Sequence, residues 1–152
     1  MPAPMADDDQ PPPTPVVEVD DRQDDAVDIE GLSALARVCL LGEGIADAEL
    51  SISFVTEDEI AELHRRYLHE DGPTDVLSFP LDDEQGEGLR QLGDVVIAPA
   101  VAARNNPDDP ASELRLLLVH GILHLLGHDH MDQAERDSMW ARQERYSGVR
   151  VR

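Results

Sequence analysis

The segment at residues 120–130, HGILHLLGHDH, constrains this chain most, because it holds four of the six histidines. His120 and His124 are four positions apart, which places both rings on one side of an α-helix, one turn from each other. The residues before them predict such a helix, since Asp109 is a suitable N-cap and Pro110 suits the first helical position. The helix also has an apolar face, formed by Leu114, Leu117, Leu118 and Leu125.

Gly127 is expected to end this helix as a C-terminal cap. The chain can then turn back, so that His130 approaches the other two histidines from outside the helix. Three imidazoles that converge on one point and leave a position for water form a catalytic zinc site. A closed structural site normally needs four protein ligands, usually thiolates, and the chain has a single cysteine, Cys39. The sequence therefore predicts one Zn²⁺ per chain, held by His120, His124 and His130.

The comparison with the HExxH metalloproteases fails at one position. In those enzymes the residue after the first histidine is a glutamate that acts as general base. Here that residue is Gly121, which carries no titratable side chain. The pattern predicts a zincin-like helix without the acid/base group of a peptidase, which argues against peptidase activity.

The same segment resembles the signature H-G-x-L-H-L-x-G-[YH]-D-H of the YbeY family, bacterial metal-dependent endoribonucleases of ribosomal RNA maturation. Two further blocks, PTDVLSFP at residues 73–80 and LGDVVIAP at residues 92–99, match the family in order and approximate spacing. The resemblance covers about residues 16–146. It implies that His120, His124 and His130 are the zinc ligands.

The resemblance also implies a function and partners. The family cleaves single-stranded RNA, acts in ribosomal RNA processing, including maturation of the 3′ end of the small-subunit RNA, and takes part in ribosome quality control. For this chain it implies ribosomal RNA and the ribosome as partners.

Three positions near the predicted metal have more than one interpretation. Asp129 suits a carboxylate that hydrogen-bonds a ligand imidazole and fixes its tautomer, and it equally suits a cap of the turn. His128 stands where the family has Tyr or His, which indicates a substrate-facing or packing side chain rather than a fourth ligand. Ser78, with Thr74 and Asp75, either lines the cleft or satisfies the backbone at a strand entry.

One position departs from the family pattern. Many members carry an arginine five residues before the proline of the PTDVLSFP block, a candidate for contacting phosphate, and here that residue is Leu68. Arg65 and Arg66 lie one turn earlier, and Arg66 is the better candidate for a catalytic cation. An ordinary solvated helix face explains both arginines equally well.

The formal net charge of −21 is unusual for a protein that binds RNA, because RNA binding normally needs a basic surface. All twelve basic residues are arginine. They are unevenly placed, with clusters at residues 64–69 and 136–152. The acidity argues against loose, non-specific binding of nucleic acid, but it leaves room for a local cationic cleft that includes the metal.

Expected strands come early in the chain and expected helices late, with short connections, which predicts an α+β fold. The resemblance to the YbeY family implies the same class, with a mixed β-sheet packed against helices and the histidine helix central. Residues 1–15 form an acidic, proline-rich tail expected to be disordered, and residues 16–152 form a single hydrolase domain. The last helix is expected to bury Met139 and Trp140, and Cys39 is expected to be a buried free thiol. No membrane span or signal pattern is predicted, and the expected location is the cytoplasm. Expected helices are at 29–41, 57–67, 100–103, 110–126 and 133–146, and expected strands at 16–19, 50–55, 76–81 and 94–98.

Three functions remain open at this point. The first is a zinc-dependent endoribonuclease of ribosomal RNA. The second is a non-enzymatic ribosome-maturation factor in which the metal only holds the fold. The third is a metal hydrolase of another phosphoester.

Overall fold

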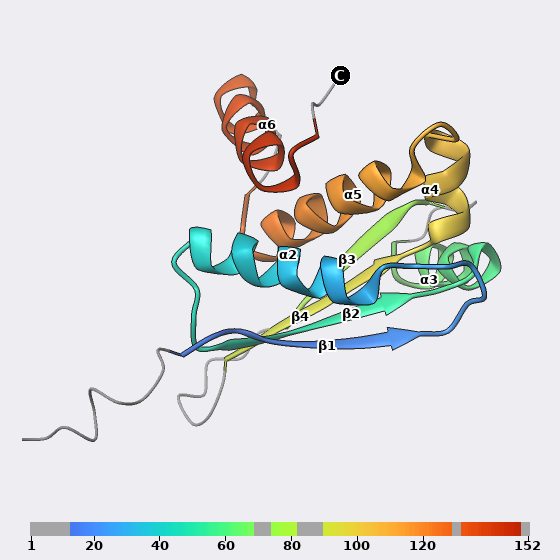
Figure 1. The fold of residues 1–152 in the computed structure, drawn as a ribbon, viewed down its shortest axis with the longest axis horizontal. Coiled ribbons are helices and arrows are strands. Elements are labelled where there is room, and N and C mark those ends of the chain that lie inside the picture. Colours follow the sequence, from blue (N-terminus) through green and yellow to red (C-terminus); the bar gives the residue numbers. More distant parts are fainter. Residues whose placement is uncertain (1–12, 69–73, 82–89, 129–131, 150–152) are drawn as a thin grey trace, which may run out of the picture.

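The computed structural model describes residues 13–68, 74–81, 90–128 and 132–149. Within these ranges the chain forms a mixed sheet with helices packed on it, so the predicted α+β class is confirmed (Figure 1). In chain order the elements are β1 (Val16–Asp21), α2 (Ile29–Gly42), β2 (Ala48–Phe54), α3 (Glu57–Leu68), β3 (Val76–Pro80), β4 (Arg90–Ile97), α4 (Pro99–Asn105), α5 (Pro110–Leu125) and α6 (Gln133–Ser147).

The sheet has the strand order β1-β2-β4-β3, in which β1, β2 and β4 run parallel and β3 runs antiparallel to β4. The alternating sequence of β2 buries one face, with Leu50, Ile52 and Phe54 fully enclosed, as the predicted period of two requires. Helices α2 and α5 lie side by side over this face (Figure 1). Helix α6 packs on α5 and α2, so α5 lies between the sheet and α6.

Helix α3 contributes to a second, smaller apolar cluster, in which Ile60 packs with Leu77 and Val96. This cluster fixes α3 against β3. Because β3 is an edge strand that contacts both α3 and α5, it is placed to border the space between these two helices.

Strand β4 begins four residues earlier than its apolar run predicts. The reason is a bulge beside Gly93, where the register with β2 shifts between Glu49 and Leu50. Gly93 has φ +134°, and a Cβ there would lie 2.3 Å from the carbonyl oxygen of Phe79. The irregular residue breaks the alternation in the sequence, although pairing with β2 continues through it.

The prediction that Trp140 is buried is wrong, whereas Met139 is fully buried as expected. Helical geometry turns consecutive side chains by about 100°, so α6 cannot present both residues to the core. Trp140 is 39% exposed, and the guanidinium of Arg136 lies over its ring at 5.9 Å. The position that shares the buried face with Met139 is Gln143, one turn further on.

Candidate metal site and cleft

Helix α5 begins and ends as its sequence predicts. The side chain of Asp109 accepts a hydrogen bond from the backbone N–H of Ser112 at 3.1 Å. At the other end Gly127 has φ +95°, its N–H donates to the carbonyl of His124, and the N–H of His128 donates to the carbonyl of Leu123, both at 3.0 Å. This pair of bonds is a Schellman motif, which ends the helix and redirects the chain directly after the second histidine.

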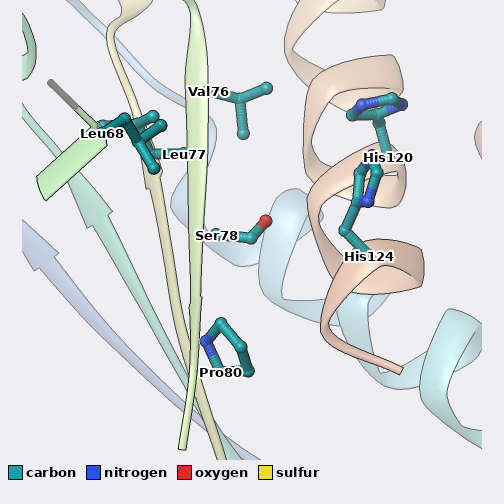
Figure 2. Close-up of a pocket in the computed structure, with 7 residues that line it drawn as sticks. All are labelled: Leu68, Val76, Leu77, Ser78, Pro80, His120 and His124. Atoms are coloured by element: carbon teal, nitrogen blue, oxygen red, sulfur yellow. The ribbon is translucent and has the colours of Figure 1, made fainter. Parts of the chain in front are cut away.

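His120 and His124 lie on the same side of α5, one turn apart, with β3 running alongside (Figure 2). Their ring centroids are 4.5 Å apart and the ring planes make an angle of 72°. Both rings line one cavity of about 340 Å³ between α5, β3 and the end of α3. The other lining residues are Leu68, Val76, Leu77, Ser78 and Pro80.

The two imidazoles fit a divalent zinc ion, since neutral imidazole nitrogens are preferred zinc ligands and these rings share one cavity. His130, the predicted third ligand, and Asp129 lie outside the described residues. Within residues 13–68, 74–81, 90–128 and 132–149, no three His, Cys, Asp or Glu side chains gather as a metal cluster. The ligand set therefore stays a prediction.

Gly121 faces the sheet, and the close approach of α5 to β3 and β4 depends on its lack of a side chain. A Cβ at this position would lie 2.7 Å from Cγ1 of Val95 and 3.3 Å from Oγ of Ser78. The hydroxyl of Ser78 donates to the carbonyl of Gly121 at 3.0 Å, which ties β3 to the helix. A glutamate in place of Gly121 would point into packed atoms, so the general base of a peptidase has no room there.

Ser78 lines the cavity, and its hydroxyl satisfies a carbonyl of α5 rather than the backbone at the entry of its own strand. A contact of Ser78 with substrate stays a prediction. Asp75 accepts a hydrogen bond from the side-chain amide of Asn105 at 3.2 Å, and its backbone carbonyl accepts from the N–H of Ala98. Neither Asp75 nor Thr74 is among the residues that line the cavity.

The ring of His120 has a buried partner that the sequence analysis did not find. Its Nδ1 lies 2.5 Å from Oε1 of Gln143, which is only 3% exposed. The spacing Met139–Gln143 was an available signal, because it places a polar side chain on the same helix face as a buried methionine.

A second network, around Glu43, holds the residue that follows the Schellman turn. One carboxylate oxygen of Glu43 lies 2.7 Å from Nε2 of His128, and the other accepts hydrogen bonds from Arg142 and Tyr146, each at 2.7 Å. The Glu43 side chain is 6% exposed. His128 is therefore linked through Glu43 to the end of α2 and to α6, and a contact of His128 with substrate stays a prediction.

The electrostatics of Glu43 follow from these contacts. Burial by itself would raise the pKa of the Glu43 carboxyl, but hydrogen bonds from Tyr146, His128 and Arg142 outweigh burial and lower that pKa below its ordinary value. Burial and the bond to Glu43 raise the pKa of the Tyr146 hydroxyl. The carboxyl of Glu43 is thus deprotonated at neutral pH, where it accepts all three hydrogen bonds.

Leu68, at the end of α3, is one of the residues that border the cavity of His120 and His124. Its side chain lines the cavity and is 49% exposed. Arg66 is exposed and is not among the lining residues, and Arg65 is paired with Glu62 one turn earlier on α3. A catalytic role for Arg66 stays a prediction.

The model of the family described as endoribonuclease YbeY matches residues 18–148 of the chain. The chain is a member of the YbeY family. Its relatives include an endoribonuclease YbeY of Salinispora tropica, 42% identical over 78% of this chain and 85% of the relative. Another, from Acidothermus cellulolyticus, is 49% identical over 63% of this chain and 66% of the relative.

A third relative, from Corynebacterium glutamicum, is 48% identical over 64% of this chain, and the match spans 56% of its length. A protein of Thermotoga maritima, determined in solution, has a similar structure, with a TM-score of 0.62 and 29% identity over 87% of each chain. The family predicted from the three sequence blocks is thereby confirmed. In the part of the chain that is described, no helix has the length and hydropathy of a membrane span.

Proposed function

We propose that this protein is a zinc-dependent endoribonuclease that cleaves single-stranded ribosomal RNA, in maturation of the small-subunit RNA 3′ end and in ribosome quality control. Membership of the YbeY endoribonuclease family supports the class of reaction. The observation that carries the proposal is the pair His120 and His124, which line one cavity from adjacent turns of a helix.

His120 and His124 would hold the zinc ion, with His130 as the third ligand. The bound zinc would supply a water of lowered pKa and positive charge for a phosphate oxygen. The residues of the chain do the positioning. Ser78 ties β3 to α5 at a fixed distance, and the Schellman turn at Gly127 directs the chain that leads to His130.

The wall of the cavity opposite the histidines is mostly apolar, with Ser78 as the polar side chain among its described residues. Leu68, Val76 and Pro80 present aliphatic groups to it, and no arginine is among the lining residues that the structure describes. This wall fits a ribose or a base better than a phosphate. Positive charge for the phosphate would come from the metal, which is consistent with the strongly acidic composition.

Several arginines elsewhere are already paired with carboxylates, which limits non-specific binding to the phosphate backbone. Arg22 pairs with Glu59 at 2.8 Å and Arg142 with Glu43 at 2.7 Å. Selection of the RNA must then depend on the cleft and on the ribosome as partner rather than on a broad basic surface.

The test is single-turnover cleavage of ribosomal RNA by the full chain, with and without a chelator, and with His124→Ala. Abolished cleavage in both cases, with recovery when Zn²⁺ is restored to the wild type, is the expected result. Gln133→Ala, at an exposed position of α6, is the control and should cleave as the wild type does.

A non-enzymatic maturation factor is the second candidate, favoured by the absence of arginine from the described cavity lining. RNA binding that is unchanged by His124→Ala, without cleavage by any zinc-loaded variant, would replace the first function by this one. Hydrolysis of small phosphoesters without cleavage of RNA would instead indicate a different metal hydrolase.

The role of Arg66 is tested separately. If its guanidinium contacts a phosphate, Arg66→Ala should weaken RNA binding and lower the slope of log affinity against log salt by about 1. Arg37→Ala on α2 is the control for loss of one positive charge. Equal effects of the two substitutions would show that Arg66 contributes only net charge.

A further inference from the structure

Gln143 is a buried polar side chain in contact with His120, one of the proposed zinc ligands, and the proposed function assigns it no role. Its Oε1 lies 2.5 Å from Nδ1 of His120, although the two residues are 23 positions apart. At 3% exposure, Gln143 has exchanged water for this contact. Burial of an amide costs free energy unless its hydrogen bonds are made, so the buried side chain of Gln143 requires a hydrogen-bond partner.

The chemistry of this contact determines where the proton of His120 lies. An amide oxygen only accepts hydrogen bonds, so Nδ1 must carry the hydrogen. In a neutral imidazole the lone pair is then on Nε2. We propose that Gln143 is a positioning residue that fixes His120 in the Nδ1–H tautomer, with Nε2 presented as the zinc ligand.

Helix α6 is held firmly enough to serve this purpose. Met139, one turn before Gln143, is fully buried in the main core. Arg142 and Tyr146 both donate to the carboxylate of Glu43 at the end of α2. Gln143 lies between these attachments, so its side chain approaches α5 from a helix fixed on both sides.

The inference rests on the zinc site of the proposed function and extends it beyond the direct ligands. A ligand histidine whose second nitrogen is held by a hydrogen-bond acceptor keeps its ring orientation and tautomer before metal binding. Loss of such a partner typically weakens metal binding by about 10- to 100-fold. Gln143→Leu should therefore weaken Zn²⁺ binding by this factor.

The experiment compares the wild type with Gln143→Leu, Gln143→Glu and Met139→Leu. The first substitution removes the acceptor, the second keeps an acceptor, and the third changes the packing of α6 without altering a hydrogen bond. The tautomer of His120 is read from imidazole ¹⁵N shifts in metal-free protein, at a pH about two units above the ordinary histidine pKa of about 6.5. Zn²⁺ affinity is measured by competition with a chromophoric chelator, and folding by thermal unfolding.

The expected result is an Nδ1–H tautomer in the wild type, in Gln143→Glu and in Met139→Leu, with Zn²⁺ affinity retained in all three. Gln143→Leu should show a mixture of tautomers and weaker binding. An Nε2–H tautomer in the wild type would overturn the proposal, because the amide would then donate to Nδ1. Wild-type Zn²⁺ affinity in Gln143→Leu would also overturn it.

These readouts are independent of RNA. A protein in which Gln143 controls the tautomer and the Zn²⁺ affinity, but which cleaves no RNA, would contradict the proposed function and leave the positioning role in place. A protein that cleaves RNA but whose His120 tautomer is insensitive to Gln143→Leu would support the proposed function and contradict the positioning role of Gln143.

Discussion

The two sides of helix α5 are buried in different ways. On the side of the sheet, Gly121 and Val95 meet so closely that no further carbon atom fits between them. On the side of α6, His120 contacts Gln143, and beyond the helix end His128 contacts Glu43. Substitutions on the first side should affect stability through added volume, and substitutions on the second side through lost hydrogen bonds and charge. The proposed metal site lies where a helix is constrained by both.

The largest expected effect comes from adding volume on the sheet side. Gly121→Glu would recreate the HExxH pattern and should destabilise the fold by about 4 kcal/mol, because a carboxylate would be forced between α5 and the sheet. Chemical denaturation measures the loss. Ala111→Glu, at an exposed position of the same helix, should change stability by less than about 0.5 kcal/mol.

Peptidase activity should not appear in Gly121→Glu. The added side chain would face Val95 and Ser78 rather than the cleft. A stable variant that hydrolyses peptides would show that the two sides of α5 do not differ as described.

The next effect concerns charge on the side of α6. Glu43→Gln should cost about 2 kcal/mol, since its amide cannot accept from His128, Arg142 and Tyr146 as a carboxylate does. Glu57→Gln is the matched control. That carboxylate pairs with Arg104 on the exposed surface, so no measurable loss is expected.

The pH dependence of this difference has a definite sign. The folded-state pKa of Glu43 is lower than its ordinary value of 4.5. Its contribution to stability is therefore fully present above about pH 4.5 and is lost as the pH falls through the folded-state pKa. The difference in unfolding free energy between wild type and Glu43→Gln should be constant at neutral pH and shrink in acid. A difference that grows on acidification would contradict the network.

A smaller effect is expected for the bond that joins β3 to α5. Ser78→Ala removes the hydroxyl that donates to Gly121 and should cost about 1 kcal/mol. Ser53→Ala, on the opposite face of the sheet, is the control. A loss in Ser78→Ala no larger than in Ser53→Ala would show that packing alone holds β3 in place.

The smallest effect is expected for the thiol of Cys39, a buried group on α2 that belongs to neither of the two sides of α5. Burial, with the nearby charge of Glu43, raises the pKa of the Cys39 thiol to about 12. The folded protein should not react with a thiol reagent at neutral pH, and labelling should follow unfolding. Rapid labelling of the native protein would show that α2 opens easily.

The sequence predicts the parts of this molecule that depend on local chemistry. The cap at Asp109, the glycine turn at Gly127 and the alternation in β2 each arise from residues within a few positions of one another. The pairing of His120 and His124 on one side of α5 follows in the same way.

The partners of the histidines could not be predicted in this manner. Glu43 and His128 are 85 positions apart, and their contact exists only because α2, α5 and α6 meet. Trp140 was misassigned for a related reason, since a large aromatic residue suggests burial while the helix turns Gln143 inward instead. The early start of β4 depends on pairing with β2, which no local pattern in residues 90–93 records.

Strand β3 is both the border of the cleft and the last strand of the sheet. Asp75 and Leu81 form backbone hydrogen bonds with residues of β4 or next to it, so the odd-numbered residues of β3 are the ones bonded to β4. The even-numbered residues Val76, Ser78 and Pro80 therefore have their backbone groups turned away from β4. Outward amides at the edge of a sheet can form hydrogen bonds with a strand of another molecule. Pro80 has no backbone N–H at its outward position. The row of outward amides beside the proposed site is therefore shorter, which disfavours pairing with a strand of another molecule.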